Sequence, residues 1–135
     1  MIRFTITSKN GEELCRVETA SVDDFYNLRD KIHSALETGE FGSRFPTLMN
    51  RFEPAEWSVQ EIPKLQRELE TIAEAFQKLP PQPDVASLQR WDEIHQGRYA
   101  TLYDVYADAE GKPLLGRLIA LCERARKAAR PIRME

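Results

Sequence analysis

The sequence has little of what builds a disulfide framework, a metal centre or a membrane anchor. Its only cysteines are Cys15 and Cys122, and their spacing fits neither a disulfide scaffold nor a zinc site. No apolar run approaches the ~20 residues that a transmembrane helix needs. The first eleven residues alternate in polarity, so we expect no secretory signal peptide. These absences favour a soluble protein of the reducing cytoplasm, with buried cysteines and with neither metal nor cofactor.

Catalytic signatures are also missing. No glycine-rich segment has the spacing of a phosphate loop or a dinucleotide fingerprint, and neither histidine lies in a nucleophile motif. Asp92 and His95 are three residues apart on an expected helix, so they could serve an unrecognised hydrolase as a general base or a partial metal site. Such a site needs more ligands and a pocket. An ordinary surface helix is the favoured interpretation, and we predict no enzyme activity and no catalytic residue.

Composition and charge describe a mildly acidic globular protein. With 41% apolar residues, 135 residues suffice for one domain over positions 1–135 with one core. The net charge is −3, but residues 112–135 carry seven basic and two acidic side chains. We interpret this basic end as a helix C-terminus whose cations complement the helix dipole. The remaining chain is acidic, which disfavours direct binding of nucleic acid.

The N-terminal segment predicts a β-hairpin. Ile2–Thr7 and Leu14–Ala20 alternate in polarity, and Asn10-Gly11 is a favourable two-residue turn. In that register one face is apolar and the other holds an ion pair. The expected cross-strand pairs are Thr7–Leu14, Ile6–Cys15, Thr5–Arg16, Phe4–Val17 and Arg3–Glu18.

The strongest periodic signal lies between residues 62 and 79. Six apolar residues share one helical stripe: Ile62, Leu65, Leu69, Ile72, Phe76 and Leu79. We expect a helix from about Ile62-Pro63 that packs on the protein's own sheet, since prolines at both ends and the short length disfavour a coiled coil. The opposite face is expected to be solvated and to carry the i,i+4 pairs Lys64–Glu68 and Glu74–Lys78.

The other predicted elements complete an α+β fold. Ser21–Asp24 and Ser58–Glu61 are capping-box patterns that precede helices. The remaining predictions are a short helical segment at Thr47–Phe52, a helix within Asp84–His95, a strand at Tyr99–Ala107, a turn at Asp108–Gly111, a helix from Lys112-Pro113, and a strand at Pro131–Met134. Together they predict a small antiparallel sheet, formed by the N-terminal hairpin and one or two later strands, covered by about three helices.

Four segments carry a family resemblance. They are SRFPTLMNRF at Ser43–Phe52, IPKLQRELETIAEAFQKLPP at Ile62–Pro81, WDE at Trp91–Glu93, and YDVYADAEGKPLLGRLIALCERARKAARPI at Tyr103–Ile132. In this order they resemble a family of bacterial immunity proteins that are encoded beside polymorphic toxins, including toxins of contact-dependent growth inhibition. The resemblance implies a non-catalytic protein that neutralises a cognate toxin domain by stoichiometric binding.

The resemblance also directs attention to acidic residues. Many such toxins are nucleases with basic clefts, which an acidic partner complements. The candidate toxin contacts are Asp84, Asp92, Glu93, Asp108 and Glu110, each of which could equally be an ordinary solvated carboxylate. The alternative function is an adaptor or regulatory module that binds another protein through the 62–79 stripe or the Phe45–Phe52 segment. That alternative requires part of those apolar residues to be exposed.

Overall fold

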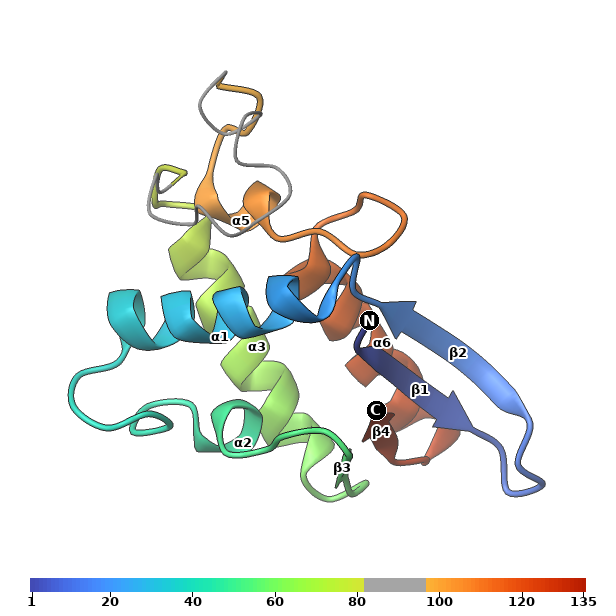
Figure 1. Cartoon of the computed structure of the whole chain (residues 1–135). Coiled ribbons are helices and arrows are strands. Elements are labelled where there is room, and N and C mark those ends of the chain that lie inside the picture. Colours follow the sequence, from blue (N-terminus) through green and yellow to red (C-terminus); the bar gives the residue numbers. More distant parts are fainter. Residues whose placement is uncertain (82–96) are drawn as a thin grey trace.

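A small antiparallel sheet and three long helices frame the protein in the computed structural model (Figure 1), which describes residues 1–81 and 97–135. The strands are β1 (Arg3–Thr7), β2 (Glu13–Glu18), β3 (Ala55–Trp57) and β4 (Ile132–Met134), in the sheet order β2-β1-β4-β3. The helices are α1 (Val22–Leu36), α2 (Pro46–Met49), α3 (Ile62–Phe76), α5 (Leu102–Val105) and α6 (Leu114–Ala128). The predicted α+β class is confirmed; the helix predicted within Asp84–His95 lies outside the described residues.

The N-terminal hairpin has the predicted register over most of its length. Four expected pairs form, from Arg3–Glu18 to Ile6–Cys15, and the Arg3–Glu18 ion pair measures 3.6 Å. The predicted two-residue turn is wrong. The Ser8 hydroxyl accepts the backbone N–H groups of Asn10 and Glu12, while Gly11 donates to the Ser8 carbonyl. This wider turn pairs Thr7 with Glu13, so that Leu14 becomes an extra residue in the strand and is exposed.

Helices α1 and α3 begin close to their predicted capping boxes. The Ser21 hydroxyl accepts the Asp24 backbone N–H at 3.2 Å at the start of α1. A one-turn lead-in from Ser58 precedes α3, whose first residues are Ile62 and Pro63, as expected. Proline fits there because the first N–H groups of a helix have no intrahelical acceptor.

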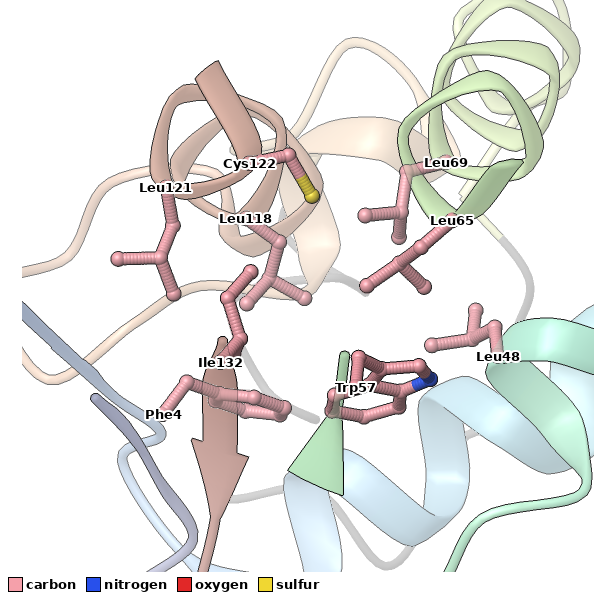
Figure 2. Close-up of a pocket in the computed structure, with 9 residues that line it drawn as sticks. All are labelled: Phe4, Leu48, Trp57, Leu65, Leu69, Leu118, Leu121, Cys122 and Ile132. Carbon is pink, nitrogen blue, oxygen red and sulfur yellow. The ribbon is translucent and has the colours of Figure 1, made fainter. Parts of the chain in front are cut away.

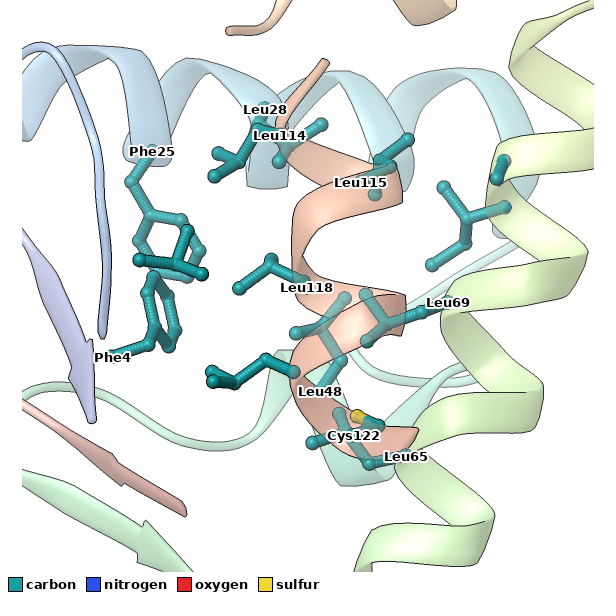
Figure 3. Close-up of a cluster of buried hydrophobic side chains, with 14 of the residues drawn as sticks. Phe4, Phe25, Leu28, Leu48, Leu65, Leu69, Leu114, Leu115, Leu118 and Cys122 are labelled. Atoms are coloured by element: carbon teal, nitrogen blue, oxygen red, sulfur yellow. The ribbon is translucent and has the colours of Figure 1, made fainter. Parts of the chain in front are cut away.

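The apolar stripe of α3 supports the protein's own core. Ile62, Leu65, Leu69, Ile72 and Phe76 are each at most 3% exposed, and Leu79 packs against the same core while remaining partly exposed. Helix α6 packs beside α3 and contributes its own buried side chains to the same core (Figure 3). Five of the six stripe residues are therefore unavailable to a partner, which weakens the case for an adaptor surface on this stripe.

One charged residue of α3 departs from the predicted solvated face. Glu68 is only 8% exposed, because its carboxylate accepts the backbone N–H groups of Thr47 and Leu48 at the start of α2. The predicted surface pair Lys64–Glu68 is thus wrong: a second segment of the chain uses the Glu68 carboxylate. The other expected pair, Glu74–Lys78, forms at 3.4 Å with both side chains exposed.

The predicted strand at Tyr99–Ala107 is wrong. Its centre forms the short helix α5, and the buried side chains Leu102, Val105 and Tyr106 follow helical spacing into the core. Aromatic and β-branched residues favour strands because they suit a half-buried pleated surface. Here burial on one helical side overrides that propensity. The turn predicted at Asp108–Gly111 is confirmed, with Gly111 donating to the Asp108 carbonyl at 3.0 Å.

The C-terminal strand is an inner strand of the sheet, and the two chain termini lie near each other (Figure 1). The predicted terminal strand is confirmed as β4, with Ile132 and Met134 buried and Arg133 exposed between them. β4 lies between β1 and β3, and β3 is a strand that the sequence pattern did not predict. None of the described helices combines the length and the apolar character needed to cross a membrane.

Candidate functional site

The interior contains a small cavity that is too small and too apolar to be a ligand site. It lies between the sheet, α3 and α6, and has a volume of about 10 Å³ (Figure 2). That volume is at the lower limit for a single water, which would also need two to four polar partners. The lining residues are Phe4, Leu48, Trp57, Leu65, Leu69, Leu118, Leu121, Cys122 and Ile132. Among the described residues, this cavity offers no functional contact.

Among the predicted acidic contacts, Asp108 is buried and used by the fold. It is 3% exposed, and one carboxylate oxygen accepts the backbone N–H groups of Glu110 and Lys112 at 3.0 and 2.9 Å. The other oxygen lies 3.0 Å from the Arg117 guanidinium on α6. These contacts fix the loop between α5 and α6, so Asp108 has little surface to offer a partner.

Glu110, by contrast, projects from this loop toward solvent. Its side chain is 65% exposed and lies 3.5 Å from Arg117. It forms one wall of a surface groove, defined here as the charged groove, whose other lining residues are Arg16, Glu18, Asp108, Ala109 and Arg117. The groove carries both signs of charge. Arg16 pairs with Glu18 at 2.6 Å, and Arg117 lies 3.0 Å from Asp108. The other predicted contacts, Asp84, Asp92 and Glu93, lie outside the described residues, as does His95.

A second surface feature is built around a buried arginine. Arg29 of α1 is 1% exposed and donates to the carbonyl oxygens of Met49 and Arg51, with the latter contact at 2.6 Å. Its guanidinium carbon lies 4.4 Å from the ring centre of Phe52 and 5.4 Å from that of Phe41. Burial lowers the pKa of Arg29, although nearby acidic groups oppose that effect. Through its hydrogen bonds and its contact with the Phe52 ring, Arg29 joins the segment after α2 to α1.

Three aromatic residues near Arg29 are defined here as the aromatic patch: Phe52, which is exposed, and Phe41 and Tyr26, which are partly buried. Phe52 is 56% exposed and stacks on Phe41, with ring centres 6.5 Å apart. The Tyr26 hydroxyl donates to the Glu53 carboxylate, which raises the pKa of Tyr26. Both flanks of Phe52 in the chain are therefore anchored, by Arg51 on one side and Glu53 on the other. An exposed aromatic ring is held in a fixed position.

The described residues offer no evident metal centre: residues 1–81 and 97–135 contain no cluster of three or more His, Cys, Asp and Glu side chains suited to an ion. Cys122 is buried, and burial raises its pKa to about 12. His33 is partly exposed at the surface, as expected, with Nε2 lying 2.9 Å from the Gly39 carbonyl oxygen.

Comparison with known proteins gives one decisive match. The model of a family described as Immunity protein 70 matches residues 9–134, nearly the whole chain. The chain belongs to the Immunity protein 70 family. No curated protein and no solved structure matches it. The expected relationship to immunity proteins of toxin systems is confirmed, and membership of this family supports a role in toxin neutralisation.

Family membership does not by itself select a binding surface on this immunity protein. Sequence reasoning directed attention to acidic residues, and of the two that the structure describes, only Glu110 is exposed. It did not select the aromatic patch as a toxin contact, although the alternative function named the Phe45–Phe52 segment as a possible binding surface. Phe45, Leu48 and Met49 are buried there, whereas Phe52 is not. The available signal was Phe52 itself, which precedes Glu53-Pro54 and falls outside the short helix.

Proposed function

We propose that this chain is a cytoplasmic immunity protein that neutralises one cognate toxin domain of a polymorphic or contact-dependent growth inhibition system. It acts by stoichiometric protein–protein binding and not by catalysis. The observation that carries the proposal is the family match over residues 9–134. A binding protein of this kind needs a stable scaffold and a complementary surface, and it does not require a catalytic pocket.

The charge of the chain supports a nuclease as the toxin. The net charge is −3, and the acidic excess lies outside the basic residues 112–135. Nuclease clefts are positively charged because they bind phosphate backbones. An acidic partner is attracted to such a cleft, and the attraction raises its association rate. Substrate and inhibitor would then compete for the same cations.

The proposed acidic contacts differ in what each can contribute. Glu110 is exposed and can pair directly with a cation of the toxin. Asp108 is buried, so its contribution would be to hold the loop that presents Glu110. Asp84, Asp92 and Glu93 are retained as proposed contacts from their chemistry alone.

The test starts from the gene that lies immediately upstream. We expect it to encode a large secreted protein with a C-terminal toxin domain. Co-expression of this chain with that domain should restore growth, and the two proteins should co-purify in a one-to-one complex. Titration calorimetry would give the stoichiometry, and a nuclease assay with the isolated domain would identify the inhibited chemistry.

Specificity provides the control. An immunity protein from an unrelated toxin system, expressed at the same level, should give no protection. Failure of this chain to bind or protect against any neighbouring toxin domain would contradict the proposal. Inhibition at far less than one equivalent would contradict the stoichiometric mechanism and indicate catalysis instead.

A further inference from the structure

The aromatic patch has the properties of an interaction anchor. Phe52 is 56% exposed and stacks on the ring of Phe41, and the residue that follows it, Glu53, accepts a hydrogen bond from Tyr26. Aromatic residues contribute a disproportionate share of the binding free energy at protein interfaces. The patch therefore differs from the scattered apolar side chains found on any surface.

The patch is also organised before any partner arrives. Arg29 contacts the Phe52 ring from below and donates to the carbonyls of Met49 and Arg51 just before it. Arg51 in turn pairs with Glu61 and donates to the Glu56 carbonyl, which secures the same segment from the other side. A ring fixed in this way loses little conformational entropy on binding, and this raises affinity.

Carboxylates and cations both lie near the patch: Asp30 and Glu53 are acidic, whereas Arg29 and the half-buried Arg51 are basic. Asp30 and Glu53 both interact electrostatically with Arg29, whose cation is itself buried beneath the rings. Asp23 and Asp30 are exposed and two turns apart, so they lie on one side of α1. A partner approaching here meets aromatic rings bordered by carboxylates, which fits a surface that presents lysine or arginine around an apolar pocket.

We propose that the aromatic patch is the docking surface for the toxin domain, with Phe52 inserted into an apolar pocket and Asp30 paired with cations at its edge. This inference rests on the proposed function and specifies its surface. Guanidinium and ammonium groups complement both parts of the surface, because they pair with carboxylates and stack on aromatic faces. The charged groove around Glu110 then lies outside the principal contact.

The principal test measures the dissociation constant of the isolated toxin domain for four variants of the full chain. Phe52→Ala should weaken binding by at least about thirtyfold, the effect of losing a central aromatic anchor. Leu14→Ala is the matched control, because Leu14 is 41% exposed on the hairpin and away from the patch. Asp30→Lys should slow association and reduce its salt dependence. Glu110→Lys, at a proposed contact outside this surface, should weaken binding less than Phe52→Ala does.

A second measurement does not depend on the folding of any variant. Hydrogen exchange of the wild-type chain should show protection across residues 49–54 when the toxin domain is bound. Thermal unfolding of each variant separates lost binding from lost folding. If Phe52→Ala unfolds the chain, the exchange experiment decides the proposal.

The outcomes separate this inference from the proposed function. Wild-type binding that is unaffected by Phe52→Ala, or a complex without protection at residues 49–54, would overturn the inference alone. Loss of binding with Glu110→Lys but not with Phe52→Ala would place the interface at the charged groove. Absence of any wild-type binding to the toxin domain would overturn the proposed function, and the docking surface with it.

Discussion

The carboxylate of Glu68 accepts the backbone N–H of Leu48 at 2.9 Å and thereby joins α3 to the start of α2. A second bond, from Thr47 to the same carboxylate, measures 3.2 Å. The N-terminal N–H groups of a helix have no acceptor within the helix, and the positive end of its dipole favours an anion. Four residues of α2 are therefore stabilised by a side chain twenty positions away.

Replacement of this carboxylate should destabilise the protein measurably. Glu68→Ala leaves two buried N–H groups without an acceptor, at a cost of about 1–3 kcal/mol in the free energy of unfolding. Urea unfolding followed by circular dichroism measures the change. Glu70→Ala, on the exposed side of the same helix, should change the free energy by less than about 0.5 kcal/mol. Equal effects of the two substitutions would show that the Glu68 contact contributes nothing.

Glu37 predicts a specific dependence of stability on pH. Burial alone would raise its pKa, but hydrogen bonds from the backbone N–H groups of Phe45, Gly42 and Arg44 lower the pKa below the ordinary value of 4.5. Because the folded-state pKa is the lower one, this contribution to stability is complete above about pH 4.5. It is lost as pH falls below that value toward the folded-state pKa.

Unfolding measurements between pH 7 and pH 3 test this relationship. Glu37→Gln should be less stable than the wild type at pH 7, and the difference should shrink as the pH falls below about 4.5. Glu40→Gln provides the control, since Glu40 is an exposed acid of the same loop. A difference between wild type and Glu37→Gln that is constant with pH would argue against an ionised Glu37 as the stabilising form.

Substitutions of Asp108 and Glu110 should differ in their effect on the free energy of unfolding. Asp108→Ala removes the acceptor of two backbone N–H groups and the partner of Arg117, so we expect a loss of about 1–3 kcal/mol. Glu110→Ala alters an exposed pair worth at most about 1 kcal/mol. Thermal unfolding of the two variants at equal concentration makes the comparison. A greater loss in Glu110→Ala would reverse the assignment of roles.

The two cysteines should differ in reactivity. Cys122 is buried and its pKa is raised to about 12, so almost no thiolate forms at pH 8, whereas Cys15 is partly exposed. Titration of the native protein with an aromatic disulfide should therefore modify Cys15 first, and Cys122 only after denaturation. In Cys15→Ser, rapid reaction should disappear. Rapid modification of Cys122 in that folded variant would contradict its burial.

Local patterns in the sequence determined much of the fold. The alternation of Phe4 and Ile6, the stripe from Ile62 to Phe76 and the hydroxyl of Ser21 each specify structure through neighbours within a few residues or across one turn. Periodicity and capping operate over that range, so they can be recognised without knowledge of the rest of the chain. The family resemblance also resides in such segments, and it indicated an immunity protein before any site was visible.

Tertiary packing decided the remaining features. Leu102 and Val105 form a helical turn in place of a strand because the core accepts them on one side, and β3 forms only because β4 lies beside it. Glu68 turns inward because α2 presents N–H groups to it, and Phe52 is held at the surface because Arg29 binds the carbonyls before it. Each outcome depends on atoms far apart in sequence, whose proximity no local pattern records.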